Sequence, residues 1–282
     1  MNINWFPGHM TKSLRMMDET IKLVDAVIYV LDARAAFSCI NPALNEIAKN
    51  KPVVYVLNKI DLISNNDKDK IITVLKNEGK TVTPLNSTAS KAGNVLSAEV
   101  KKLCSHKIEK AANRGIKTCI RAMVVGIPNS GKSTLVNNLC GRGAAKAGNK
   151  AGVTRGKQWI KIDDYFEVLD TPGTLYPKIT DQTIARRLAF IGSINDDILD
   201  KEWLSLELIN ELDAINTSYI TQKYMVCEGE SVARLESISK SRGFLGKGAE
   251  VDTLKGAVAL IDDFRKGRLG KIALETGTKS EH

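Results

Sequence analysis

The sequence has few cysteines and no long apolar run. Its five cysteines include no Cys-x-x-Cys pair, and an odd number cannot all pair within one chain. This pattern indicates reduced thiols rather than a disulfide framework. The longest apolar run, Ala26 to Leu31, is far too short to span a bilayer, and residues 1–17 contain no apolar signal core. We therefore expect a soluble cytoplasmic protein with no membrane partner.

Hydrophobic residues make up 43% of the 282 residues and charged residues 26%, which is enough apolar material for an ordinary core. A chain of this length accommodates one large domain or two ordinary ones, and we expect two. The net charge of +9 favours polyanionic partners such as RNA, membrane phospholipid or nucleotide phosphates.

The basic residues are clustered. Residues 142–161 contain six basic residues and no acid, and residues 101–121 contain seven basic residues against Glu109. Such a run is either a solvated face or a nucleic-acid surface, and the charge alone does not decide between them.

Short β-branched apolar runs alternate with helical spacing in the first part of the chain. The expected strands are residues 26–31, 53–57, 81–85 and 122–125, with a hairpin of 158–162 and 165–169 around Asp163 and Asp164. Residues 10–23, 67–77, 95–112 and 133–140 are expected helices. Strands that are apolar on both faces and alternate with helices predict a doubly wound α/β domain with a mainly parallel sheet.

After Pro177 strand patterns disappear and helical spacing takes over, at residues 182–191, 203–212 and 251–264. We read these apolar stripes as the core of a small all-helical domain. The predicted division is 1–177 for the α/β domain and 178–282 for the helical domain.

The stretch GIPNSGKST, Gly126 to Thr134, fits GxxxxGK[ST] between a predicted buried strand and a predicted helix. In a loop of this kind the glycines let backbone N–H groups face the β-phosphate at a helix N-terminus. Lys132 supplies charge to the β- and γ-phosphates, and Ser133 a hydroxyl to Mg²⁺. The predicted phosphate contacts are Asn129, Ser130, Gly131, Lys132, Ser133 and Thr134.

The stretch DTPG, Asp170 to Gly173, follows another predicted strand. An acid at that position can hold the Mg²⁺ shell, and the Gly173 N–H can meet the γ-phosphate. Alone, DxxG is a common turn. With GVTR between the two motifs, Thr154 becomes the expected switch residue for Mg²⁺ and the γ-phosphate.

The stretch NKID, Asn58 to Asp61, follows a buried strand, where ligands of such sheets bind. A carboxylate at Asp61 accepts two hydrogen bonds from the guanine edge, and adenine would leave it unpaired at a cost of about 1–3 kcal/mol. Asn58 and Lys59 are expected to brace neighbouring loops and cover the ring. The alternative is that the tetrapeptide NKID only caps a helix and binds no base. After the third strand, Ser87, Thr88 and Ala89 offer backbone N–H groups for the guanine O6.

The motifs run in an unusual order, with the base loops before the phosphate loop and the switches. Chain termini that lie close together allow circular permutation without disturbing a sheet. We therefore predict a circularly permuted chain that binds GTP.

With WFPGHM at residues 5–10, DAR at 32–34 and NP at 41–42, the motif set resembles the circularly permuted GTPases over nearly the whole chain. RGFL at 242–245 and DFRKGRLGKIALE at 263–275 resemble the C-terminal domain of that family. The resemblance implies a circularly permuted P-loop GTPase domain followed by a helical domain that binds rRNA. It also implies a role in late maturation of the large ribosomal subunit precursor, with hydrolysis stimulated by the particle. We expect a monomer.

Catalysis needs a substitute for a missing glutamine. Ras-type GTPases carry glutamine directly after the DxxG glycine, whereas Thr174 stands here and is too short to position water in the same way. The family resemblance assigns His9 to that task, against the alternative of a capping or surface histidine. Asn129 suggests a K⁺ site by analogy with potassium-stimulated GTPases, and Arg34 and Arg155 are candidate arginine fingers.

Two other functions compete with a GTPase switch. An RNA-binding scaffold would hold GTP structurally and hydrolyse it incidentally. A nucleotide-dependent kinase would share the phosphate loop, but NKID and DTPG argue against it.

Overall fold

The computed structural model describes residues 3, 8–144, 158–226, 229–246, 248 and 250–277. A six-stranded sheet lies at the centre of the α/β part, in the order β3-β2-β1-β4-β6-β5. The strands are β1 (Ala26–Asp32), β2 (Val53–Asn58), β3 (Thr81–Pro84), β4 (Ile120–Val125), β5 (Gln158–Asp163) and β6 (Phe166–Asp170). All neighbouring pairs are parallel except β5 and β6, which form the predicted hairpin. The fold class predicted from the sequence is confirmed.

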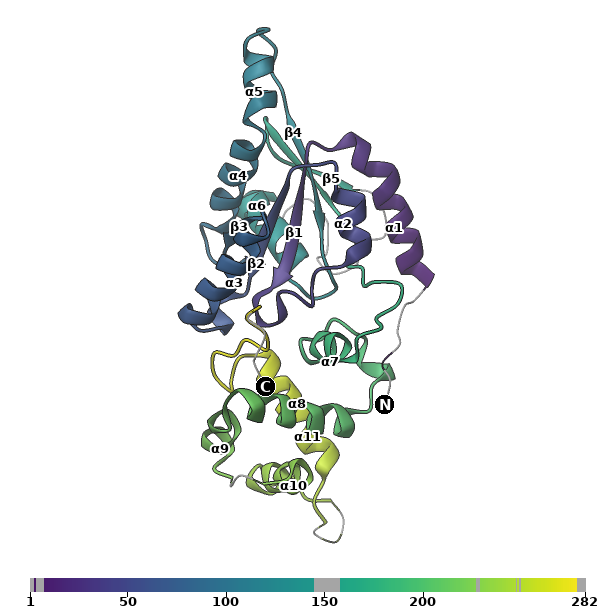
Figure 1. Ribbon diagram of the computed structural model, residues 1–282, viewed down its shortest axis with the longest axis vertical. Coiled ribbons are helices and arrows are strands. Elements are labelled where there is room, and N and C mark those ends of the chain that lie inside the picture. Colours follow the sequence, from purple (N-terminus) through teal and green to yellow (C-terminus); the bar gives the residue numbers. More distant parts are fainter. Residues whose placement is uncertain are drawn as a thin grey trace.

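Alternation along β1 separates two hydrophobic layers. Val27, Tyr29 and Leu31 belong to one layer with residues of α1 (Gly8–Thr20), α2 (Pro42–Ala48) and α3 (Asn65–Asn77). Ala26, Ile28 and Val30 belong to the other, with residues of α4 (Ala92–Leu103) and α6 (Lys132–Ala144). Because successive strand side chains point to opposite faces, a fully apolar strand such as β1 needs helices on both sides, and it has them (Figure 1).

The helix expected over residues 95–112 is two helices, and that expectation was wrong. α4 ends at Leu103, Cys104 leaves helical geometry at ψ 16°, and α5 (Ser105–Ala112) follows. Apolar spacing continues across the break, so the pattern gives no sign of it. The consequence is that α5 projects from the sheet at the end opposite the helical part of the chain (Figure 1).

The C-terminal part is helical among its described residues. It consists of α7 (Gln182–Phe190), α8 (Lys201–Asn216), α9 (Ser218–Tyr224), α10 (Ser231–Ser241) and α11 (Thr253–Arg265). Its buried side chains, including Leu188, Leu208 and Leu260, belong to the same hydrophobic cluster as the α1–α3 layer of the sheet. The predicted division at residues 177 and 178 therefore stays a prediction, since one continuous core runs across it.

Several short 3₁₀ turns complete the framework, namely η1 (Ile21–Leu23), η2 (Ala33–Ala35), η3 (Ile60–Leu62) and η4 (Asp196–Ile198). η2 and η3 follow the carboxyl ends of β1 and β2. Both contact the segment after α11, because Leu274 N–H donates to the Arg34 carbonyl oxygen and Ile272 N–H to that of Leu62. Within the described residues no helix is long and apolar enough to cross a membrane.

Candidate functional site

The carboxyl ends of β1 and β4 lie side by side at the point where the chain changes direction across the sheet. From β1 the chain runs outward through β2 to β3. From β4 it runs the other way, first to β5 at the edge of the sheet and then back to β6, which pairs with β4. Loops that follow neighbouring strands diverge at such a point and leave a crevice where ligands of open α/β sheets bind. The base loop after β2 and the phosphate loop after β4 both lie at this edge.

Asn58 joins three of the predicted loops. Its side chain is fully buried, donates from Nδ2 to the Ser130 carbonyl oxygen at 2.8 Å and accepts at Oδ1 from the Ser87 N–H at 2.9 Å. Gly131 makes this approach possible, because a Cβ there would lie 2.2 Å from Asn58 Nδ2. These two hydrogen bonds hold the base loop against the phosphate loop and the second base loop.

Lys59 connects the base loop to the phosphate loop from a left-handed backbone conformation with φ 60°. Its Nζ donates to the Asn129 carbonyl oxygen at 2.7 Å and lies 2.8 Å from Asp32 Oδ2. Burial alone raises the pKa of Asp32, but Arg34 and Lys59 outweigh it and hold that pKa well below its usual range. Asp32 is therefore an ionised carboxylate that orients Lys59, a role the sequence reasoning missed.

The phosphate loop is held in a tight curve by contacts of its own. A Cβ on Gly126, at φ 147°, would lie 2.5 Å from the Val30 carbonyl oxygen, so only glycine fits beside β1. Lys132 Nζ and Ser130 Oγ both donate to the Ile127 carbonyl oxygen, at 2.6 and 3.0 Å. Burial lowers the pKa of Lys132 to about 8 although Asp170 opposes the shift. Phosphate oxygens in this loop would restore the charge on Lys132.

The DTPG turn packs directly on the phosphate loop. Thr174 N–H donates to the Gly126 carbonyl oxygen at 3.1 Å, and the Thr171 hydroxyl donates to the Val124 carbonyl oxygen at 2.6 Å. A Cβ on Gly173 would lie 2.6 Å from Pro128 Cα and 2.9 Å from Lys132 Nζ. The backbone of Gly173 is thus close enough to the loop to share a phosphate with it.

Asp170 and Ser133 supply the oxygen donors that Mg²⁺ prefers. Asp170 is buried at the end of β6, and its charge acts on Lys132, while Ser133 lies in the first turn of α6. Within the described residues no group of three or more His, Cys, Asp or Glu side chains forms a metal cage. Such a small set of protein donors suits a Mg²⁺ ion whose coordination is completed by nucleotide phosphates and water rather than by protein alone.

The second base loop, residues 86–90, is tied to the phosphate-loop helix. Asn138 on α6 donates to the carbonyl oxygens of Ser87 and Ala89, at 3.1 and 2.7 Å, and accepts from Gly93 N–H at 2.9 Å. Sequence reasoning missed Asn138, although an asparagine in a helix interior is itself a signal. Backbone N–H groups of Thr88 and Ala89 bond to Asn86, so a contact with guanine O6 requires one of them to exchange partners.

The side chain of Asn129, in the phosphate loop, contacts the segment after α7. Asn129 has φ 58°, is exposed, and its amide donates to the Gly192 carbonyl oxygen at 2.5 Å. Ser193 similarly donates to the Pro128 carbonyl oxygen at 2.8 Å. The phosphate loop therefore contacts the end of α7, and the K⁺ site expected at Asn129 stays a prediction.

The remaining predicted residues are less closely associated. Asp61 and Thr134 are exposed at the same edge, in η3 and α6. His9 is exposed in the first turn of α1, where its carbonyl oxygen accepts from Ser13 Oγ at 3.0 Å, and no hydrogen bond joins its imidazole to another described residue. Thr154 and Arg155 lie outside the described residues.

Arg34 has a different task from that of an arginine finger. Its guanidinium is buried, pairs with Asp32 through Nε and Nη2 at 3.0 and 2.8 Å, and donates from Nη1 to the Arg265 carbonyl oxygen at 3.0 Å. It therefore links the base loop to the end of α11.

Comparison with known proteins agrees with this geometry. The model of the family described as 50S ribosome-binding GTPase matches residues 121–219. Ribosome biogenesis GTPase A of Bacillus cereus is 38% identical over 98% of this chain and 94% of its own length. The protein of the same name from Priestia megaterium is 35% identical over 100% of this chain and 99% of its own. A crystal structure of YlqF from T. maritima bound to GNP has the same fold, with a TM-score of 0.67 over 94% of this chain and 97% of that one at 24% identity.

Proposed function

Because the chain belongs to the ribosome biogenesis GTPase A family, we propose that it hydrolyses GTP while bound to the large ribosomal subunit precursor and acts in its late maturation. GTP binding is supported by one observation in particular. Two hydrogen bonds of Asn58 join the base loop, the phosphate loop and the second base loop. These three loops, which the sequence predicts to contact guanine and phosphates, thus meet at one edge of the sheet.

In the proposed reaction the protein positions the reactants and stabilises charge. Asp61 selects guanine, Lys59 covers the base, and Lys132 with the loop amides holds the β- and γ-phosphates. Ser133, Thr154 and Asp170 would hold Mg²⁺, which supplies charge neutralisation at the phosphates. Gly173 meets the γ-phosphate through its backbone.

Water activation requires a residue other than Thr174, whose side chain is buried and whose Oγ1 donates to the Pro172 carbonyl oxygen at 3.2 Å. We assign it to His9, whose imidazole is exposed in the first turn of α1 and thus accessible to a bound nucleotide or partner. K⁺ beside Asn129 would add charge neutralisation if the amide turns its oxygen toward the phosphates.

The partner half of the proposal rests on the family and on charge. Residues 1–177 would form the GTPase domain and residues 178–282 the helical domain that binds rRNA, in a cytoplasmic monomer. The contacts from Asn129 to Gly192 and from Ser193 to Pro128 support communication between the phosphate loop and the helical part.

The test is co-sedimentation of the full chain with large-subunit precursors in GTP, GDP and a non-hydrolysable GTP analogue, combined with turnover measured with and without the particles. We expect the triphosphate states to co-sediment more strongly than GDP and the particles to accelerate turnover. A Lys132→Ala control should lose the nucleotide dependence. Binding with no acceleration of turnover would favour an RNA-binding scaffold instead.

A further inference from the structure

The projecting helix α5 is a rigid element. Lys107 Nζ anchors it to Asp25 Oδ2 at 2.7 Å and to the Cys119 carbonyl oxygen at 3.1 Å, and Ile108 packs against the α4–α6 layer. Its end is closed by hydrogen bonds from Ile116 N–H to the Ala111 carbonyl oxygen and from Gly115 N–H to that of Ala112, with Gly115 at φ 69°. These are the two bonds of a Schellman motif, so the turn after α5 has a fixed direction.

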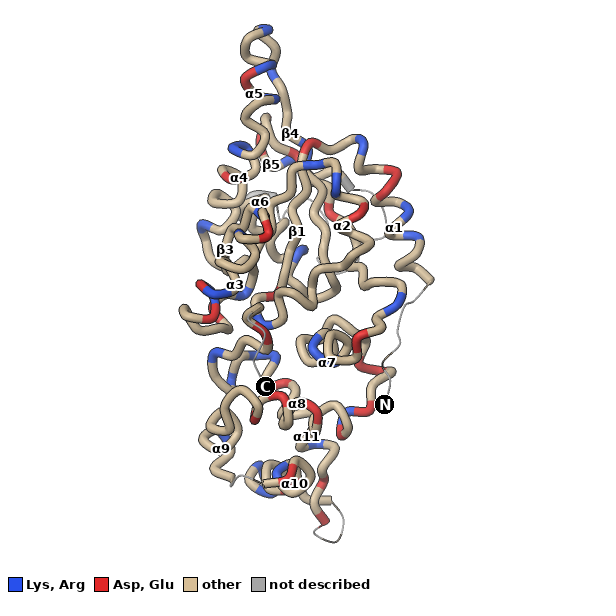
Figure 2. The backbone as a smooth tube through the Cα atoms, viewed as in Figure 1, with Lys and Arg blue, Asp and Glu red and all other residues tan. Residues whose placement is uncertain are grey.

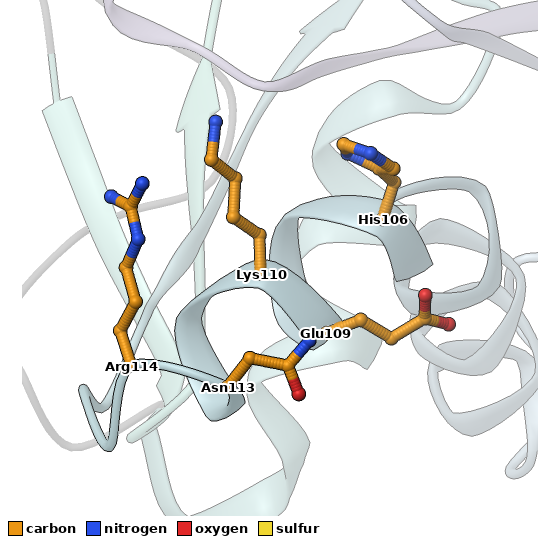
Figure 3. A pocket seen from close by; sticks show the side chains of 5 residues that line it. All are labelled: His106, Glu109, Lys110, Asn113 and Arg114. Atoms are coloured by element: carbon orange, nitrogen blue, oxygen red, sulfur yellow. The ribbon is translucent and has the colours of Figure 1, made fainter.

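Two cationic side chains, Lys110 and Arg114, and the imidazole of His106 follow one side of this element at intervals of four residues. All three are exposed, and they line an open depression of about 380 Å³ together with Glu109 and Asn113. Lys110 and Arg114 extend side by side, whereas the Glu109 carboxylate points away from them (Figure 3). Basic residues continue to the outermost turn (Figure 2).

These cations differ from those at the base of the projection. Lys101, Lys107 and Arg121 form ion pairs with Asp163, Asp25 and Glu167. Within the described part of the chain, by contrast, no ion pair involves Lys110, Arg114 or Glu109. The outer end of α5 therefore carries two exposed cations, Lys110 and Arg114, that pair with no carboxylate of the described residues.

The chemistry of these side chains points to phosphates of double-stranded RNA. Side chains four apart on a helix lie about 6 Å from one another, a separation suited to successive phosphates on one strand. Residues 105–117 contain no Phe, Trp or Tyr, so the surface has no platform for stacking unpaired bases. The apolar side of α5, at Ile108, packs against the α4–α6 layer, and Ile116 in the turn after α5 is the large apolar side chain left exposed there. A single isoleucine offers a bilayer little apolar area.

We propose that His106, Lys110 and Arg114 form a docking surface for the phosphate backbone of an RNA duplex, separate from the nucleotide site. The surface lies at the end of the molecule opposite the helical part (Figure 1), so its affinity should not depend on which nucleotide is bound. The proposal deepens the proposed function and rests on it for the identity of the RNA as ribosomal.

The experiment measures fluorescence anisotropy of a labelled RNA duplex of about 20 base pairs with the full chain, from about 50 to about 200 mM KCl. The test variant is Lys110→Gln with Arg114→Gln. The control is Lys70→Gln with Lys76→Gln, which removes the same charge from exposed positions of α3. A second test variant, Lys110→Arg with Arg114→Lys, keeps both charges.

We expect the Gln pair on α5 to raise Kd about tenfold at 100 mM salt and to reduce the slope of log Kd against log salt by about 2, one for each lost phosphate contact. The α3 control and the charge-conserving variant should match the wild type, in GDP and in the GTP analogue alike. Equal losses on α3 and α5, or no duplex binding by the wild type, would overturn the proposal.

Two further measurements distinguish RNA binding from membrane binding and from a failure of the proposed GTPase function. If the α5 Gln pair loses retention on phosphatidylglycerol vesicles while its duplex affinity stays at the wild-type value, the surface serves a membrane and the RNA proposal fails. GTP turnover without RNA should be the same in all variants. A wild type that does not hydrolyse GTP would refute the proposed function while leaving the duplex measurement to decide the role of α5.

Discussion

Lys59 Nζ lies 2.7 Å from the carbonyl oxygen of Asn129, so the loop after β2 is hydrogen-bonded directly to the phosphate loop after β4. The two loops belong to distant parts of the sequence, and the sheet places them at one edge because β1 pairs with both β2 and β4. Chain order therefore does not matter to the site. What matters is that each motif follows the carboxyl end of the correct strand.

Asp61→Asn should change base preference. In the proposed site the Asp61 carboxylate would accept from the guanine N–H edge, whereas an amide would also donate, which suits the carbonyl of xanthine. We expect GTP affinity to fall by about 1–3 kcal/mol and xanthosine triphosphate affinity to rise, as measured by nucleotide titration. The exposed Asp18→Asn on α1 is the control. Unchanged GTP affinity would remove Asp61 from the base site.

Asn58→Ala should destabilise both the fold and the site. The change leaves the Ser130 carbonyl oxygen and the Ser87 N–H without their partner in a buried position. Each such group costs about 1–3 kcal/mol, so chemical denaturation should show a loss in that range or above it, with weaker GDP binding. Asn66→Ala, at an exposed position of α3, should change neither quantity. A variant as stable as the wild type would contradict the bracing role.

Nucleotide binding above pH 8 should take up a proton at Lys132. Burial lowers the pKa of Lys132 to about 8, so in the free protein this amine loses its proton as pH rises through that value. Bound phosphates raise the pKa again, and GDP affinity should therefore fall by up to about tenfold per pH unit above pH 8. Calorimetry at pH 8.5 in buffers of different ionisation enthalpy measures the uptake. Lys132→Arg, whose guanidinium stays charged, should show none, and equal uptake in both proteins would reject the assignment.

Much of this site is predictable from the sequence because its motifs are contiguous. GIPNSGKS and NKID each combine a buried strand with a loop, so residue type and local context suffice to place them. Asp32 and Asn138 act across long sequence separations, and only the parallel register that pairs Asp32 with Asn58, and the packing of α6 on the second base loop, bring them to the site. The break at Cys104 escapes prediction for another reason, since apolar spacing is the same in one bent helix and in two.

Arg34→Gln should loosen the connection between the base loop and α11. It removes the guanidinium that pairs with Asp32 and donates to the Arg265 carbonyl oxygen, leaving the buried carboxylate with Lys59 as its one charged partner and the backbone N–H of residue 34 as a donor. Breaking a buried ion pair costs about 3–5 kcal/mol, which chemical denaturation can measure. Hydrogen exchange should also accelerate at the end of α11. The exposed Arg15→Gln on α1 should stay within about 0.5 kcal/mol of the wild type, and a similar result for Arg34→Gln would refute the link.

His9→Ala should separate binding from catalysis. The imidazole makes no hydrogen bond with another described residue, and Met10 beside it supplies the buried anchor of α1, so stability should change little. Nucleotide affinity should also survive, because Lys132, the loop amides and Mg²⁺ hold the phosphates in the proposed site. If His9 orients the attacking water, particle-stimulated kcat should fall by about 10²–10⁴-fold, the range expected for one positioned acid–base group. Lys12→Ala, an exposed neighbour in the same helix, is the control. Single-turnover rates with large-subunit precursors decide the question, and equal rates for His9→Ala and the wild type would leave His9 as a surface residue of α1.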